Sequence, residues 1–213
     1  MEHSSINVEQ AQRIIAASQS GDIPCLPRPV SHSNDWIKPL LESGSDGIII
    51  QMVNNSKDVE DLINDIKYPP IGKRSYGVNR AQNYGFDFEK YVDFWNKESI
   101  FIIQIESREG VENINSLLSF DEIDGVMIGP LDISGSYGQP GKLTHPDVVK
   151  AINAVIDSCK KYNKSCGTQI ADPSIKNVSQ LFNDGYNFAI LGSDLFALYN
   201  WTNNMNTIIK KFK

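Results

Sequence analysis

The chain has 213 residues, of which 40% are hydrophobic and 22% are charged, an ordinary mixture for a globular protein with one sizeable core. Its formal net charge of −6 argues against non-specific nucleic-acid binding, which depends on a basic face. No apolar run approaches the roughly 18 residues of a membrane span, so we expect neither nucleic acid nor a membrane among its partners.

The first five residues have neither the basic stretch nor the apolar core of a signal peptide. The three cysteines, Cys25, Cys159 and Cys166, are widely spaced and form neither a zinc-binding motif nor a disulfide framework. Such thiols suit a reducing compartment. We therefore predict a cytoplasmic protein with buried, unreactive cysteines.

Short β-branched runs alternate with amphipathic segments along the whole chain. The runs predicted to be strands are Ile23 to Val30, Gly47 to Val53, Ser99 to Ile105, Gly125 to Ile128, Ser165 to Ile170 and Phe188 to Gly192. The segments predicted to be helices are 8–18, 35–42, 57–66, 88–96, 110–118, 146–162, 173–183 and the stretch from Leu195 onwards. Strands without strict polar alternation are typical of a sheet covered on both faces. The pattern predicts an α/β fold in a single domain, residues 1–213, with a parallel sheet under helical cover.

Boundary signals accompany several of these helices. The predicted helix starts are Ser56 before residue 57, His145 before Pro146 and Asp172 before Pro173. Gly44, Gly167 and Gly185 follow helical segments, where a left-handed cap favours glycine.

The number of strands leaves two architectures open. A closed (β/α)₈ barrel has eight strands and typically about 250 residues, whereas six strands are evident here. The chain is either an open six-stranded sheet or a TIM barrel that lacks two strands. Spacing alone does not decide between them.

Two acidic residues follow neighbouring predicted strands. Glu106 comes directly after the run ending at Ile105, and Asp132 lies just past the run ending at Ile128. Consecutive parallel strands bring their carboxyl ends to one face, where ligands bind. Two carboxylates there can share a hard divalent cation. The alternative for each residue is a helix N-cap, which is common for Asp and less natural for Glu.

Arg74 and Gln104 are further candidates. Arg74 lies in a turn shaped by Pro and Gly, where its guanidinium could polarise a carbonyl or bind a carboxylate. The alternative is an exposed loop arginine. Gln104 shares the side-chain direction of Glu106, two residues on, so it could donate to a substrate oxygen or lie hydrogen-bonded in the barrel interior.

Other polar segments carry weaker signals. The loop from Gly135 to Gly141 lacks the spacing of a nucleotide-binding motif and is predicted to be a mobile lid. His3, His32 and His145 lie in terminal, loop and helix-start contexts, and no Ser-His-Asp or Cys-His arrangement is evident. From the residues alone, no histidine is assigned a catalytic role.

These residues lie in segments that resemble the HpcH/HpaI aldolase family, metal-dependent class II aldolases that act through a pyruvate enolate. The resemblance runs from Glu2 to about Tyr199, and the matching segments occur in family order. They are Glu2-His3-Ser4, Tyr68-Pro69-Pro70-x-Gly72-x-Arg74, Gly77 to Gly85, Gln104-Ile105-Glu106, Asp124 to Ser134 and His145-Pro146. Singly most are weak, but the ordered set is specific.

The resemblance implies a (β/α)₈ barrel, often in homo-oligomers whose last helix packs on a neighbouring subunit, such as trimers or hexamers. It implies Mg²⁺, Mn²⁺ or Co²⁺ on the residues matching Glu106 and Asp132. The metal in this family also holds the carboxylate and keto oxygens of a 2-keto acid.

The resemblance assigns further roles to individual positions. Arg74 matches the catalytic arginine at the keto oxygen, and Gln104 a substrate-binding glutamine. The backbone at Gly129, Leu131 and Asp132 matches the cradle of the substrate carboxylate. His3 matches the histidine of a Glu-His pair that is tied to proton transfer.

The sequence departs from the family pattern at three places. Ser75 stands where Gly is usual, and Gln51 stands where Pro usually precedes Met-Val. The Glu-His pair ends the second barrel strand of the family, yet here it directly follows Met1. The sequence is therefore expected to lack the first strand, the first helix and most of the second strand. Three explanations would each account for this. The recorded start lies inside a longer gene, the chain is a decayed remnant of the family, or a partner subunit completes the barrel.

The expected reaction is cleavage of a 4-hydroxy-2-keto acid to pyruvate and an aldehyde, and its reverse. The cation and Arg74 would stabilise the enolate, and His3 would serve as the base. The alternatives are a non-catalytic remnant of the family and, less favoured, a citrate-lyase-like enzyme acting on acyl-CoA thioesters. The sequence does not identify the aldehyde.

Overall fold

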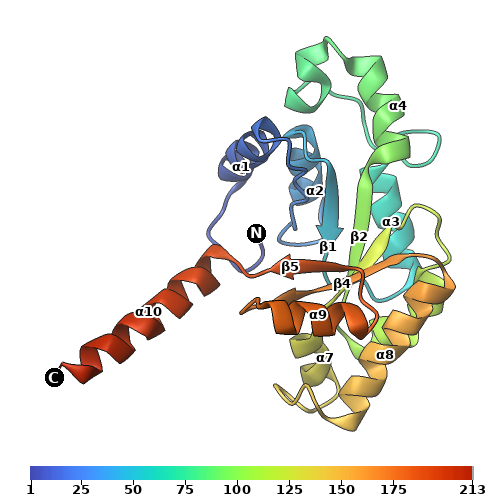
Figure 1. The fold of residues 1–213 in the computed structure, drawn as a ribbon. Helices are drawn as coiled ribbons and strands as arrows, with labels where there is room; N and C mark the ends of the chain where they lie inside the picture. The colour runs from blue at the N-terminus through green and yellow to red at the C-terminus, as the bar shows by residue number, and fades with distance from the viewer. Residues whose placement is uncertain (213) are drawn as a thin grey trace.

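Five parallel strands form the centre of the computed structural model, which describes residues 1–212. They lie side by side in chain order as β1 (Gly47–Ile50), β2 (Ile100–Ile105), β3 (Gly125–Ile128), β4 (Ser165–Ile170) and β5 (Phe188–Leu191). The sheet curls into a half-barrel with helices outside it (Figure 1). This architecture confirms the predicted fold class, an incomplete TIM barrel.

Helices precede, connect and follow the strands. They are α1 (Val8–Ser20), α2 (Asn34–Glu42), α3 (Ser56–Ile66), α4 (Phe88–Glu98), α5 (Arg108–Glu112), α6 (Ile114–Leu117), α7 (Pro130–Ser136), α8 (Pro146–Lys161), α9 (Ile175–Asn183) and α10 (Asp194–Lys211), with a 3₁₀ segment, η1 (Arg80–Gly85). The predicted helix over 110–118 is divided into α5 and α6 at Asn113. Neither η1 nor α7 was predicted: η1 lies between two predicted helices, and only the end of α7, from Gly135, falls in the segment predicted to be a loop.

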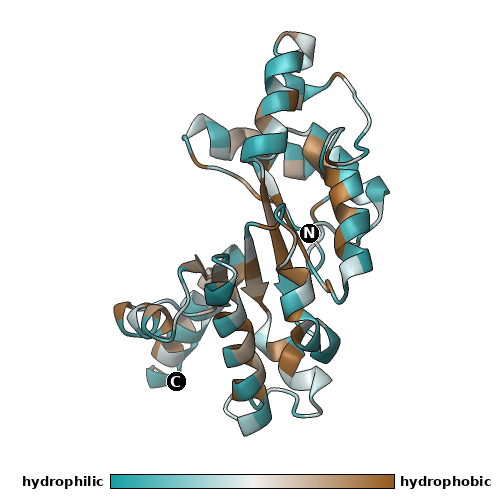
Figure 2. Ribbon diagram, turned by 90° about the vertical axis from the view of Figure 1, so that its right-hand side faces the viewer, coloured by the Kyte–Doolittle hydropathy of each residue, from teal (hydrophilic) through white to brown (hydrophobic). Residues whose placement is uncertain are grey.

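The core fills the space between the sheet and its outer helices. The middle strands line its centre, because every residue of β3 is buried and Phe101, Ile103 and Ile105 of β2 are fully buried. Figure 2 shows apolar residues concentrated along the strands, with hydrophilic residues on the outer faces of most helices. Burial on both faces explains why these strands read as continuous apolar runs.

The first predicted strand, Ile23–Val30, is extended without being part of the regular sheet. Its carbonyls at Cys25 and Pro27 accept hydrogen bonds from Asp46 and Ile49, so it lies along β1. Pro24, Pro27 and Pro29 have no N–H to donate, which interrupts a regular ladder. The prediction of six strands is therefore wrong by this one segment.

The predicted helix boundaries are partly confirmed. His145 caps α8, and Gly44 and Gly185 have positive φ angles of 85° and 106° after α2 and α9. Gly167 is not a cap, because it lies inside β4. A Cβ there would lie 2.3 Å from ring atoms of Phe188, so the close approach of β5 explains this glycine. The start predicted at Asp172 is also wrong, since Ser174 caps α9.

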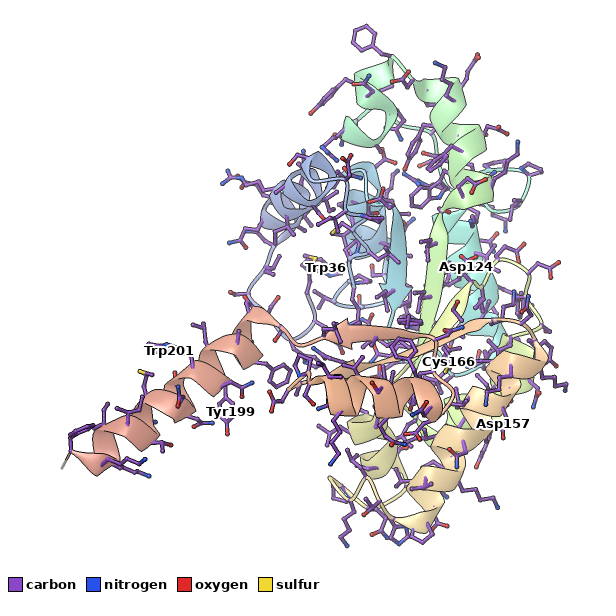
Figure 3. The ribbon with its side chains drawn as sticks, in the orientation of Figure 1. Trp36, Asp124, Asp157, Cys166, Tyr199 and Trp201 are labelled. Atoms are coloured by element: carbon purple, nitrogen blue, oxygen red, sulfur yellow. The ribbon has the colours of Figure 1, made fainter. Side chains whose placement is uncertain are left out.

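Helix α10 projects away from the rest of the chain (Figure 1). None of its residues is buried, although it carries large apolar side chains. Tyr199 and Trp201, labelled in Figure 3, extend from this helix clear of the half-barrel, and each is more than 60% exposed. Within residues 1–212, no helix is both long and apolar enough to cross a membrane.

Candidate active site

Glu106 is a buried carboxylate at the carboxyl end of β2, with only 7% of the residue exposed. Its Oε2 accepts a hydrogen bond of 2.6 Å from Nε2 of Gln104, and its Oε1 accepts one of 2.9 Å from the backbone N–H of Met52. Two donors, one from β2 and one from the segment after β1, thus fix both carboxylate oxygens. This confirms that Gln104 and Glu106 lie side by side.

The environment of Glu106 disfavours its charge. Burial is the main cause, and it raises the pKa of Glu106 from 4.5 to about 7. The negative charges of Asp132 and Glu2 raise this pKa further, while the Met52 N–H and the Arg28 guanidinium lower it. The site therefore holds more negative than positive charge, a condition that a bound cation would relieve.

Gly129 allows the turn after β3 to pack directly on this carboxylate. A Cβ at Gly129 would lie 2.8 Å from Cβ of Glu106 and 3.0 Å from its Oε2, too close for any side chain. The N–H of Gly129 donates to the carbonyl of Ile105 at 3.0 Å. That N–H is therefore already used within the sheet, which leaves the first turn of α7 as the nearer source of free donors.

Asp132 and Leu131 lie in the first turn of α7, immediately after Gly129 and Pro130. Both residues are exposed, and Leu131 is 63% exposed. The effect of Asp132 on the pKa of Glu106 indicates that their charges interact across the ends of β2 and β3. The structure thus brings together Gln104, Glu106, Gly129 and Asp132 from the predicted set.

Arg28 belongs to this group, although it was not among the residues predicted from the sequence. Its Nη1 donates to Oε1 of Gln104 at 2.7 Å, and its Nε lies 3.5 Å from Oε2 of Glu2. The arginine lies in the Pro-rich segment beside β1, where an arginine within a predicted strand was a usable signal. Its guanidinium is the positive charge that acts on Glu106.

Arg74 lies elsewhere, and this corrects its expected position. It is buried, and its Nη2 donates to Oε1 of Glu42 at 2.8 Å while the guanidinium packs over Tyr68 and Trp95 at 4.5 and 4.9 Å. Glu42 ends α2 and Trp95 lies near the end of α4, so both stand where the chain enters β1 and β2. In Figure 1 this end of the molecule is opposite the arrowhead of β1. The contacts of Arg74 are therefore those of a structural ion pair.

His3 reaches the edge of the site through its neighbour. Its Nε2 lies 3.8 Å from Oε2 of Glu2, which also approaches Arg28, and 78% of its side chain is exposed. The backbone nitrogen of Met1 donates to the carbonyl of Arg28 at 2.7 Å, which holds this segment against the site. His145 only caps α8, whereas His32 contacts the carbonyl of Gln51.

The predicted lid, Gly135 to Gly141, begins in the last turn of α7. Gln139 and Gly141 donate backbone hydrogen bonds to the carbonyl and hydroxyl of Ser134, respectively. The ring of Tyr137 lies 4.5 Å from the guanidinium of Arg108. These contacts tie the segment to α7 and α5 beside the site.

The carboxylates can be compared with the needs of a divalent cation. Within residues 1–212, no three or more His, Cys, Asp and Glu side chains cluster as a metal site. Glu106 and Asp132 offer two carboxylates, and Mg²⁺ commonly takes one or two of these with water and substrate oxygens. A carboxylate has about four lone-pair positions, so the two donors on Glu106 leave room for a cation. The donor set fits a hard cation that is shared with a substrate.

The sequence matches the profile of one protein family over residues 1–200, which is most of the chain. That family is described as HpcH/HpaI aldolase/citrate lyase. The chain belongs to this family. The resemblance recognised from the sequence motifs is therefore confirmed.

Two bacterial 2-keto-3-deoxy-L-rhamnonate aldolases are similar along most of this chain. The 2-keto-3-deoxy-L-rhamnonate aldolase of Klebsiella pneumoniae is 36% identical over 169 residues, which are 78% of this chain and 62% of that protein. The enzyme of the same name from Salmonella typhimurium is 31% identical over 188 residues, 87% of this chain and 68% of its own. The chain thus spans less than two thirds of the Klebsiella relative.

Solved structures of the HpcH/HpaI family share the fold. An HpcH/HpaI aldolase/citrate lyase family protein from Burkholderia cenocepacia superposes with a TM-score of 0.89 at 22% identity, covering 99% of this chain and 83% of its own. At this identity the likeness concerns the fold alone. It agrees with a half-barrel that corresponds to part of a larger barrel.

Proposed function

We propose that this protein is the catalytic part of a divalent-metal-dependent class II aldolase that cleaves a 4-hydroxy-2-keto acid to pyruvate and an aldehyde. One observation carries the proposal: the buried carboxylate of Glu106, beside Asp132, is linked through Gln104 to the guanidinium of Arg28. Two carboxylates and the positively charged guanidinium of Arg28, together at the carboxyl ends of the strands, suit a substrate that binds through carboxylate and keto oxygens. The relatives' name suggests 2-keto-3-deoxy-L-rhamnonate as the substrate.

Glu106 and Asp132 would hold the cation, for which Mg²⁺, Mn²⁺ and Co²⁺ are the candidates. When bound, the cation supplies Lewis-acid stabilisation of negative charge on the keto oxygen. Gln104 and the Met52 N–H orient the Glu106 carboxylate towards the rim. Oriented ligands of this kind do not have to reorganise during the reaction.

Arg28 takes the role that the family resemblance assigned to Arg74. Its hydrogen bond to Gln104 places a permanent positive charge beside Glu106, where negative charge develops on the enolate. The side-chain amide of Gln104 donates to Glu106 and its carbonyl oxygen accepts from Arg28, so Gln104 fixes the relative position of these two opposite charges.

The remaining roles follow the family pattern. The backbone N–H groups of Leu131 and Asp132, in the first turn of α7, would receive the substrate carboxylate, while Gly129 lets this turn approach Glu106. His3, whose side chain is accessible and lies beside Glu2 and Arg28, would take the proton of the C4 hydroxyl as C3–C4 breaks. The electron pair of that bond then forms the enolate.

We also propose that the chain works in the cytoplasm as a homo-oligomer, a trimer or a hexamer. The support is α10, an 18-residue helix that buries no residue within its own chain. Its apolar side chains, Leu195, Leu198, Tyr199 and Trp201, would be covered by a second copy.

The test is release of pyruvate from 2-keto-3-deoxy-L-rhamnonate by the purified chain, followed with lactate dehydrogenase and NADH. We expect Mn²⁺-dependent activity that EDTA abolishes and added Mn²⁺ restores. Glu106→Gln should lose activity by at least about 1,000-fold, since it removes a metal ligand. Activity that persists in this variant would refute the metal site.

Other outcomes would select the alternative functions. Mn²⁺ binding without pyruvate release from several 4-hydroxy-2-keto acids would indicate a non-catalytic member of the family. Binding of coenzyme A in a titration would favour an acyl-CoA lyase, in agreement with the second half of the family description.

A further inference from the structure

A single peptide group, between Gln51 and Met52, lies between His32 and Glu106. The carbonyl of Gln51 is 2.5 Å from Nε2 of His32, and the N–H of Met52 donates to Oε1 of Glu106 at 2.9 Å. The two ends of one rigid planar unit are therefore held from opposite sides. Whatever fixes the carbonyl also fixes the direction of the N–H.

Met52 has an unusual backbone conformation at this point. Its φ angle is 51°, in the left-handed region that L-residues other than glycine rarely adopt. The side chain of Met52 does not compensate by packing, because the residue is 44% exposed. The contacts made by the peptide itself are thus the forces that oppose the strain.

The chemistry of His32 sets the direction of its hydrogen bond. A carbonyl oxygen can only accept, so Nε2 of His32 must carry a hydrogen. Both the neutral Nε2–H tautomer and the protonated ring meet this condition. The ring is anchored one residue before Ser33, the N-cap of α2, a helix whose buried residues share the core with those of β1.

Rotation of this peptide would reverse its polarity towards the site. The Gln51 carbonyl would then face Glu106, replacing a favourable donor with a repulsive acceptor next to a buried carboxylate. Neither contact uses the N–H of residue 51, so the Gln in place of the family's usual Pro leaves the arrangement intact.

We propose that His32 is a positioning residue for the metal-binding carboxylate: by holding the Gln51 carbonyl it aims the Met52 N–H at Glu106 and so presets the orientation of that ligand. The metal part of this inference rests on the proposed function. The positioning part rests only on the contacts of His32, Met52 and Glu106. No catalytic contact with substrate is assigned to His32.

The experiment compares His32→Phe, which removes the donor but keeps a flat ring, with His32→Gln, which keeps an amide N–H donor. The first measurement is hydrogen exchange at the Met52 amide in metal-free protein, by NMR. The second is the affinity for Mn²⁺ alone, by electron paramagnetic resonance. In His32→Phe, we expect the protection of the Met52 amide against exchange to fall at least tenfold. The affinity for Mn²⁺ should fall about 10–100-fold, which is the usual effect of removing a residue that orients a metal ligand. His32→Gln should restore both to within about threefold.

Each outcome decides a separate part. Unchanged Met52 protection in His32→Phe would overturn the positioning role, whatever happens to Mn²⁺. Lost protection of the Met52 amide with unchanged Mn²⁺ affinity would show that His32 has no role in metal binding. If the unmodified chain binds no Mn²⁺, the proposed function fails, while the exchange of the Met52 amide still decides the positioning. If His32→Phe does not fold, His32→Gln can be compared with His32→Asn, whose amide donor does not reach as far. Equal Met52 protection in these two variants would overturn the positioning role.

Discussion

Gln104 donates from Nε2 to Oε2 of Glu106 at 2.6 Å, so two side chains on the same face of β2 form a rigid pair at the strand end. Because the carbonyl of the same amide accepts from Arg28, the orientation of Gln104 is fixed by its two partners. The strand thus delivers a carboxylate whose position does not depend on a flexible loop.

The stability of the metal-free chain should depend on pH through Glu106. Its pKa is raised to about 7 from 4.5, so the folded state binds this proton more tightly than the unfolded chain. The group therefore favours folding below about pH 4.5 and progressively opposes it as the pH rises to 7 and above.

Glu106→Gln removes this penalty. We expect the variant to be more stable than the unmodified chain at pH 8, by on the order of 2 kcal/mol, and nearly equal at pH 4.5. Urea denaturation of EDTA-treated protein at both pH values measures the difference. A variant that is less stable at pH 8 would contradict the unfavourable burial of this charge.

Arg28 and Arg74 should differ sharply when each is replaced by Met. Arg28→Met removes the charge beside Gln104 and Glu106, and we expect kcat to fall by about 100- to 1,000-fold with little change in thermal stability. Arg74→Met leaves Glu42 buried without its partner, which typically costs about 3–5 kcal/mol, while activity per folded molecule is retained. The double variant Arg74→Met with Glu42→Gln should recover part of that stability.

The reverse pattern, with catalysis lost only in Arg74→Met, would support the original family match for Arg74. Steady-state kinetics, corrected for the folded fraction by circular dichroism, separates the two results.

The sequence predicted the strand ends well and the partners across the sheet poorly. Glu106 and Gln104 could be placed because they belong to one apolar run whose period fixes their direction. Asp132 followed from the next run in the same way, whereas Gly129 was assigned by the family resemblance. The prediction of Gln104, Glu106 and Asp132 needs only local pattern and parallel order.

Arg28 and Arg74 depend on contacts that the local pattern does not contain. Arg28 meets Gln104, 76 positions away, and Arg74 meets Glu42, 32 positions away. Met52, whose φ angle is positive, likewise pairs with Glu106, 54 positions away, and no glycine in the sequence there predicts this conformation. Long-range pairing, rather than propensity, determines which arginine reaches the site.

Helix α10 should control the oligomeric state. Replacing Leu198 and Trp201 with Glu adds charge to a face that has no cover within its own chain. We expect the variant to be a monomer by light scattering where the unmodified chain is a trimer or hexamer, with circular dichroism unchanged. A matched control is Asn204→Glu on the same helix. Equal masses for the unmodified chain and the double variant would exclude this helix as the contact.

Gly129 should tolerate no side chain, because its neighbour is Glu106, the carboxylate that we propose as a metal ligand. In Gly129→Ala, the added Cβ would stand 2.8 Å from Cβ of Glu106, which is fixed by the β2 backbone and cannot move aside without the strand. We expect at least a tenfold loss of Mn²⁺ affinity and a comparable loss of activity, with a decrease in stability of about 1–3 kcal/mol from overpacking.

Gly135→Ala is the matched control, since nothing lies within 4 Å of a Cβ at that position in α7. It should bind Mn²⁺ as the unmodified chain does, and its stability should be equal or slightly greater, because Ala favours a helix over Gly. If both variants bound Mn²⁺ normally, the close contact of the β3–α7 turn with Glu106 would have no part in shaping the metal site. Loss of binding in Gly129→Ala alone ties that turn to the position of the carboxylate.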